Sequence, residues 1–229
     1  MKTKLLGTAS AIALGLMSQA HAATPAPMFN WTGCYVGGHV GYGWSNNKGY
    51  DYGAPSYSID YSGNGGIYGG QIGCDYQPAG TMWVFGVQGA LSGADIRGQG
   101  QNNFGTAVDN KITSLGSITG RIGYTGLINP LSMIYVKGGW AFARQTQFLD
   151  VPGTAHVSRN GWTLGAGWEW ALAAWGLRNW SAFLEYEHYQ FGSKTYDISG
   201  NDERTKTRAD TVLLGLNFRF SAPPAPPPP

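Results

Sequence analysis

Residues 34–44 read CYVGGHVGYGW, and in this stretch apolar or aromatic side chains alternate with small or polar ones. Successive side chains of a β-strand point to opposite faces, so a period of two over about ten residues is typical of a strand that can cross a bilayer. The pattern returns as WTLGAGWEW at 162–170 and as LLGLNFRF at 213–220. These repeats predict an all-β chain, and more specifically a transmembrane β-barrel.

The two ends of the chain differ in composition from the region between them. Residues 1–22 resemble a secretory signal, with two lysines, an apolar core over residues 5–17 and the small-x-small site AHA at 20–22. Proline dominates the last nine residues, SAPPAPPPP. We predict a signal peptide (1–22), a periplasmic N-terminal segment (23–32), an outer-membrane barrel (33–220) and an extended Pro-rich tail (221–229).

The overall composition favours curved, aromatic-rich sheets over helices. The 229 residues include 36 glycines and 14% aromatic residues, whereas charged residues make up only 12%, against about 25% in soluble domains. That many uncharged and aromatic positions need lipid or a large dry core. The net charge of +2 is too small to indicate nucleic acid as a partner.

Alternation predicts eight antiparallel strands joined by two kinds of connection. The strands are expected near 33–44, 65–76, 82–93, 112–125, 132–144, 161–170, 180–191 and 209–220. Long polar stretches, expected as external loops, follow the odd-numbered strands at 45–64, 94–111, 145–160 and 192–208. Short periplasmic turns follow the even-numbered strands at 77–81, 126–131 and 171–179. This asymmetry is typical of outer-membrane barrels.

The two faces of each predicted strand differ in chemistry. One face is almost wholly apolar, as lipid requires of the outside of a barrel. The other face carries the polar residues Gln71 and Gln88 and the charged residues Asp75, Arg121, Lys137, Glu169, Glu185, Glu187 and Arg219. Side chains fill the interior of an eight-stranded barrel. We therefore predict that these seven charges form a paired network inside, with Arg121, Lys137 and Arg219 close to the two carboxylates of 185 and 187.

Two patterns of reactive side chains have both a catalytic and a structural interpretation. Glu185 and Glu187 could act as acid and base, but salt bridges to nearby cations explain them more simply. His156 and Ser158, with several acidic residues elsewhere in the chain, resemble a hydrolase pair, but they fall in a predicted loop. Neither His39 nor His188 has a metal-ligand partner at a usable spacing. We predict no catalytic site, no metal site and no cofactor, so the chain is not expected to be an enzyme.

Cys34 and Cys74 are the only cysteines. If the first hairpin pairs Trp44 with Asn64, antiparallel counting places the two cysteines opposite each other on the same face. An oxidising compartment would then favour a cross-strand disulfide, which we predict. The alternative is two lipid-facing thiols that behave as small apolar side chains.

Several short motifs, in their order along the chain, resemble those of the small outer-membrane β-barrels of α-proteobacteria, the porin-like or OmpA-type surface barrels. They are NWTG (30–33) before YVGG (35–38), WVFGV (83–87), GRIGY (120–124), GWTLGAG (161–167), EY (185–186) and GLNFRF (215–220). The resemblance implies an abundant structural protein that touches the cell wall below and a host or the environment above. It also implies that Phe218 and the terminal Phe220 form a signal for the barrel-assembly machinery. The chain departs from the family pattern in its Pro-rich tail.

Three functions remain open from the sequence. The first is a structural barrel whose external loops contact lipopolysaccharide, host or neighbouring cells, with peptidoglycan as a further possible partner. The second is a porin or a haem- or ligand-uptake barrel, because some members of the resembling family are described in that way. The third is an enzyme that modifies lipid A. A plugged eight-stranded interior favours the first.

Overall fold

The computed structural model describes residues 29–51, 58–101, 107–148, 154–198 and 201–221. Its strands are β1 (Gly33–Asp51), β2 (Ser58–Tyr76), β3 (Trp83–Gln101), β4 (Ala107–Thr125), β5 (Ser132–Phe148), β6 (Thr154–Ala171), β7 (Trp180–Ile198) and β8 (Asn201–Ser221), and a short 3-10 helix, η1 (Leu172–Trp175), follows β6. The predicted signal peptide and residues 222–229 of the predicted tail lie outside the described residues.

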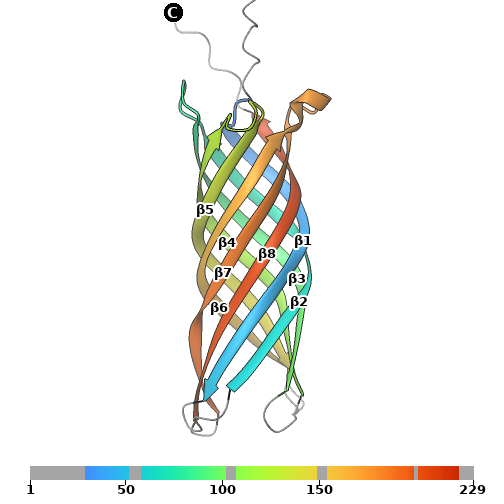
Figure 1. Ribbon diagram of the computed structural model, residues 1–229, viewed down its shortest axis with the longest axis vertical. Coiled ribbons are helices and arrows are strands. Elements are labelled where there is room, and N and C mark those ends of the chain that lie inside the picture. Colours follow the sequence, from blue (N-terminus) through green and yellow to red (C-terminus); the bar gives the residue numbers. More distant parts are fainter. Residues whose placement is uncertain (1–28, 52–57, 102–106, 149–153, 199–200, 222–229) are drawn as a thin grey trace, which may run out of the picture.

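The strands form one closed antiparallel barrel in which each strand pairs with the next and β1 pairs with β8 (Figure 1). The prediction of an eight-stranded antiparallel barrel is confirmed. Gly33 pairs with Ser221, so the two ends of the barrel chain lie side by side. In Figure 1 this end, with η1, is at the top, and β1 runs downward from it. The described residues include no helix long and apolar enough to cross a bilayer.

Burial alternates along the strands as the sequence pattern predicts. The outward-facing side chains include large, exposed apolar residues on every strand: Val36, Val40, Tyr68, Ile72, Phe85, Val87, Leu91, Ile118, Ile122, Val136, Trp140, Trp162, Leu164, Leu184, Val212, Leu214 and Leu216. The side chains between them are buried in the barrel. Because a hydrocarbon solvent accepts apolar groups but not bare charges, this arrangement suits a barrel with lipid around it.

The strands extend further toward the external end than the sequence pattern predicted. Much of each stretch expected as a loop is strand, since β1 continues from residue 44 to Asp51 and β3 from residue 93 to Gln101. The outward side chains that the structure describes at this end of the barrel are polar, among them Asn46, Asp95, Arg97 and Arg144. We call this part of the barrel, above the outward apolar band, the external extension.

The first hairpin, β1 and β2, has the register that the sequence argument for the disulfide assumed. Trp44 lies opposite Asn64, and Cys34 therefore lies opposite Cys74. The two cysteines form a disulfide that closes a sequence separation of 40 residues. On the other side of β1, Cys34 pairs with Phe220 of β8. The disulfide thus lies beside the seam where the last strand closes the barrel.

Candidate functional site

The periplasmic end of the barrel interior is closed by a tryptophan that precedes β1. Trp31 is completely buried and packs with Val84, Met133 and Tyr135. The Arg219 guanidinium lies 4.8 Å from the centroid of the Trp31 ring and donates a hydrogen bond of 3.0 Å to the Trp31 carbonyl. Trp31 belongs to the predicted periplasmic N-terminal segment (23–32). Its side chain is buried in the barrel interior and fills the periplasmic mouth.

Above Trp31 lies a balanced cluster of four charges, which we call the lower network. Arg121 contacts Asp75 and, at 3.1 Å, Glu169. Arg219 contacts the same two carboxylates at 2.9 and 2.8 Å. All four side chains are almost completely buried. Two cations and two anions cancel, and the shared contacts leave no carboxylate without a guanidinium partner.

Polar neighbours add hydrogen bonds to a carboxylate of the lower network. Ser181 and Asn217 donate to Glu169 Oε1 at 2.6 and 3.0 Å. Asn217 Oδ1 in turn accepts from Gln71 at 2.8 Å, and Gln71 Oε1 accepts from Gln88 at 3.0 Å. A chain of side-chain amides therefore crosses the interior from the charges toward β3. Buried polar groups with their partners in place specify one arrangement of the core.

A second cluster, the upper network, contains the remaining three predicted charges. Lys137 Nζ lies 2.8 Å from Glu185 Oε1 and 2.8 Å from Glu187 Oε2. Tyr135 donates a hydrogen bond to Glu185, and Thr163 donates one to Glu187, both at 2.8 Å. The two carboxylates are thus held by a lysine and two hydroxyls in a buried site.

The seven predicted interior residues are all buried, but their pairing differs from the expectation in part. Of the three predicted cations, Lys137 contacts Glu185 and Glu187, whereas Arg121 and Arg219 pair with Asp75 and Glu169. Strand alternation identifies the face of a residue but not its height in a tilted barrel. The height of each inward side chain depends on the register between strands, and this separates the cations into two clusters.

Toward the external end the interior becomes mainly apolar. A continuous cluster of buried side chains fills it: Ile67, Ala94, Ile96, Ile112, Leu115, Ala141, Ala143, Phe183, Tyr189, Phe191, Ala209 and Leu213. Ser45, Arg159 and Thr207 are also buried there. Along β3, β4 and β5 these apolar residues follow the polar ones toward the external end. We call this cluster the apolar seal. Most of it lies above the charge networks, whereas Phe183 and Leu213 lie at the level of Glu185 or closer to the periplasmic end.

Several large interior rings pack against glycines on the neighbouring strand. Tyr135 lies opposite Gly167, and Phe183 lies opposite Gly215. A Cβ atom at either glycine would collide with the ring. The missing side chains therefore make room for aromatic rings, as expected in a narrow, strongly curved barrel.

The other residues singled out from sequence do not form a site together. Ser158, considered as a hydrolase residue, is in β6 and exposed, and the His156 side chain lies outside the described part. His188 contacts Asp210 at 2.7 Å on the outer surface. His39, by contrast, is buried and its ring lies 2.8 Å from the Ser92 hydroxyl. The described residues contain no group of three or more potential metal ligands.

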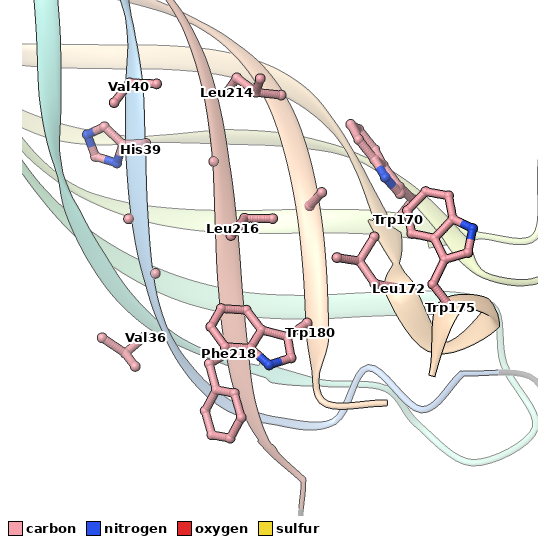
Figure 2. Close-up of a pocket in the computed structure, with 14 residues that line it drawn as sticks. Val36, His39, Val40, Trp170, Leu172, Trp175, Trp180, Leu214, Leu216 and Phe218 are labelled. Carbon is pink, nitrogen blue, oxygen red and sulfur yellow. The ribbon is translucent and has the colours of Figure 1, made fainter. Parts of the chain in front are cut away.

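The outer surface also carries an apolar groove of about 790 Å³ across β1, β8, β7 and β6 (Figure 2). Gly38, Leu216, Ala182 and Trp170 follow one another across paired strands, and the small residues at 38 and 182 hollow the surface. Trp175 of η1 stands at one end of the groove. The outward side chains that line the groove are apolar, as contact with acyl chains requires.

Phe218 and Phe220, the predicted assembly signal, lie on the outward face near the periplasmic end of β8. Their rings contact each other with centroids 5.3 Å apart, and Phe218 also contacts Trp180 of β7. Phe220 is exposed. The pair therefore lies on the surface of the closing strand.

Comparisons with known proteins agree with this architecture. A family model described as "Outer membrane protein beta-barrel domain" matches residues 9–220. The 31 kDa outer-membrane immunogenic protein of Brucella melitensis is 27% identical over 94% of this chain and 95% of its own length. The 25 kDa outer-membrane immunogenic protein of Brucella abortus is 30% identical over 85% of this chain and 82% of its own length.

One solved structure supports the fold. The outer-membrane protein OprG of Pseudomonas aeruginosa has a TM-score of 0.61 at 11% identity, covering 85% of this chain and 99% of that one. A family match over most of the sequence, together with a closed barrel that has an apolar outer band, identifies this chain as an outer-membrane protein of the outer-membrane β-barrel family.

Proposed function

We propose that the protein is a structural, non-conducting barrel that holds its external extension and loops outside the outer membrane. The filled interior carries this proposal. Trp31, the two charge networks and the apolar seal follow one another along the barrel axis. Ions cross a membrane only along a hydrated path, and tightly packed apolar side chains exclude water from such a path. The packing therefore favours a structural role over a porin.

The external extension supports a role at the cell surface. Its described outward side chains are polar and its strands rise beyond the apolar band, so the extension suits water on its outside. Two relatives are named as immunogenic outer-membrane proteins. By analogy we propose that this chain presents its extension and loops to lipopolysaccharide, to a host surface or to neighbouring cells.

We further propose that the role is not enzymatic. Glu185 and Glu187, the carboxylates weighed as an acid and a base, are buried and held by Lys137. A substrate in the membrane or in solution has no route to them past the apolar seal. Mass spectrometry of lipid A from cells with and without the protein should give identical spectra, and a mass difference would contradict this proposal.

Assembly and wall contact complete the proposal. The exposed Phe220 at the end of β8 is available to the barrel-assembly machinery before insertion. Replacing Phe220 with alanine should slow insertion more than it lowers the stability of the inserted barrel. The predicted Pro-rich tail, outside the described residues, begins at the periplasmic end and is proposed to reach toward peptidoglycan as an extended chain.

Planar-bilayer recording tests the sealed lumen. The purified protein should give no steady, stepwise conductance under conditions in which an open trimeric porin conducts. Steady channels of uniform size from the folded barrel would overturn the structural proposal in favour of the porin. Heat-modifiability on a gel confirms that the protein in the recording is folded.

Cysteine labelling tests the orientation. Ser158→Cys places a thiol on the outer face of the external extension, and Leu177→Cys places one at the periplasmic turn after η1, where Leu177 is exposed. The native cysteines are joined in a disulfide and do not react. A membrane-impermeant maleimide should label Ser158→Cys in intact cells and Leu177→Cys only after the outer membrane is opened. The reverse result would place the extension in the periplasm.

A further inference from the structure

Three basic side chains gather on one side of the external extension, directly above the apolar band. Arg97 of β3 pairs with Lys111 of β4. Lys111 pairs with residue 146 of β5, and Arg144 lies two residues from it on the same face. Such diagonal neighbours have their Cα atoms about 7–8 Å apart. We call Arg97, Lys111 and Arg144 the basic patch.

An irregularity in β4 brings Lys111 into this patch. Leu115 and Ile112 both point inward although they are three residues apart, and the pairing with β5 shifts between Ile112 and Ser114. A β-bulge adds one residue and reverses the alternation beyond it. Without the bulge, Lys111 would point into the apolar seal. With it, the ammonium lies outside beside Arg97.

A single carboxylate organises the patch without neutralising it. Arg97 donates to both oxygens of Asp95, at 2.9 and 3.1 Å, and Lys111 Nζ lies 2.8 Å from Asp95 Oδ1. Asp95 therefore holds two of the cations next to each other. Among the charged side chains that the structure describes on this surface, three are positive and one is negative, a formal charge of +2. An anionic ligand would meet cations that are already held close together.

The surface immediately below the patch is apolar. Leu91, Ile118 and Trp140 point outward from the same three strands, and each is more than half exposed. A ligand that covers both regions needs an anionic head and an apolar body. A phosphorylated lipid has this form, whereas a soluble anion would leave the apolar part uncovered.

On the opposite side of the barrel, the outward side chains that the structure describes at the same height carry less positive charge. Among the described outward residues there, Asn46, Asn160 and Gln190 are neutral. Arg208 donates a hydrogen bond to Gln190 at 2.9 Å, and Asp210, two residues away on β8, adds a negative charge. Among the described outward side chains at this height, those of β3, β4 and β5 are therefore the more basic group.

We infer that the basic patch binds the phosphate groups of lipid A, with the acyl chains lying on the apolar surface below. This inference rests on the proposed orientation, because only the outer leaflet of the outer membrane contains lipid A. Arginine binds phosphate in a bidentate manner, and lysine binds it as a point charge. The site would fix one lipopolysaccharide molecule against a defined side of the barrel.

The test uses the refolded mature protein in phosphatidylcholine vesicles that contain a fluorescent bis-phosphorylated lipid A. Energy transfer from the tryptophans of the barrel measures how strongly this lipid is enriched beside the protein. The wild-type barrel should enrich it, and the variant R97Q/K111Q/R144Q should not. Each single substitution should weaken the enrichment about fivefold, as expected for one basic residue at a charged membrane surface.

Arg178→Gln is the matched control for each single substitution. Arg178 is exposed at the periplasmic end, and its replacement removes one positive charge, as each single substitution in the basic patch does. It should leave the enrichment unchanged. Equal enrichment of dephosphorylated lipid A, an undiminished signal in the triple variant, or an equal loss in Arg178→Gln would overturn the inference. Displacement of the lipid by an equal concentration of inorganic pyrophosphate would show a general anion site and would also overturn it.

Failure of this inference can be distinguished from failure of the proposed function. If Ser158→Cys is labelled from outside and the triple variant still enriches lipid A, the orientation stands and only the patch is wrong. All variants should migrate as folded barrels on unheated gels, because the three side chains lie outside the packed interior.

Discussion

Leu216 and Arg208 both point outward from β8, but they belong to two regions of opposite polarity. Leu216 lies in the middle of the apolar run from Val212 to Phe220, while the inward side chain next to Phe220 is the buried Arg219. Beside Arg208, which lies in the external extension, the inward residue is the buried Ala209. The barrel thus has ions inside and apolar groups outside in one region, and a mainly apolar interior with polar groups outside in the other.

The two regions show that the same alternating strand pattern can suit lipid along one part of a strand and water along another. Lipid offers a charged side chain no hydrogen-bond partner or counter-ion. In the membrane region such a side chain must therefore pair with other side chains inside the barrel, as those of the lower network do. In water, apolar side chains inside and charges outside are stable as in a soluble protein. The change of solvent along each strand therefore inverts the role of its two faces.

The largest effect should come from removing an ionic partner in the membrane region. Glu169→Leu leaves Arg121 and Arg219 with one carboxylate between them, and it also removes the acceptor of Ser181 and Asn217. Removing one partner of a buried ion pair lowers the free energy of unfolding by about 3–5 kcal/mol. Urea unfolding in phospholipid vesicles, followed by tryptophan fluorescence, should show this loss or a failure to fold.

The control for this change is Asp95→Leu in the external extension. Asp95 is also a carboxylate with two cationic partners, but all of them are on the outer surface. Exposed ion pairs contribute little to stability. A loss comparable to that of Glu169→Leu would mean that the two regions do not differ in the way their charges are stabilised.

The next effect concerns the apolar seal. Leu115→Ala removes a completely buried side chain of the seal and should cost about 3–4 kcal/mol, which is usual for a leucine cavity in a tight core. Ser114→Ala, on the adjacent outward position, should change the free energy of unfolding by less than about 0.5 kcal/mol. If Leu115→Ala were equally neutral, the extension would not have a packed core.

The outer faces can be compared directly by adding the same charge to each. Leu216→Arg puts a cation against lipid and should cost roughly 2–4 kcal/mol, the range for a lipid-facing arginine near the midplane. Ser158→Arg puts one on the extension and should alter the free energy of unfolding by less than about 0.5 kcal/mol. Equal tolerance at both positions would remove the boundary inferred between the apolar band and the extension.

Sequence alone predicted the membrane region well because lipid imposes a strict pattern there. The alternation around Val36 and Val40, and the inward position of residues such as Arg121, follow from that pattern. The external extension was read as loops, although Ala94 and Ile96 alternate with Asp95 and Arg97. Its polar outer face conflicts with lipid, so a search for lipid-facing strands rejects it.

Other features depend on contacts between distant residues. Trp31 fills the barrel mouth because Arg219, which is 188 positions away, lies over its ring. The separation of Lys137 from the two arginines depends on inter-strand register, which alternation does not encode. The outward position of Lys111 depends on a bulge in β4 that single-sequence periodicity does not reveal. These contacts exist only in the closed barrel, so the sequence pattern of a single strand does not reveal them.

The smallest effect should separate inner from outer glycines in the membrane region. A Cβ at Gly167 would meet the ring of Tyr135 inside the barrel, whereas one at Gly138 would find only ordinary contacts, the nearest at 3.4 Å. Gly167→Ala should therefore lower the free energy of unfolding by about 1 kcal/mol through overpacking, and Gly138→Ala should not lower it. Tyr135→Phe in the Gly167→Ala background tests the cause: removing the phenol oxygen, one of the atoms in the collision, should recover part of the loss relative to Tyr135→Phe alone. If it recovers nothing, the cost of Gly167→Ala arises from the backbone and not from the packing of the ring.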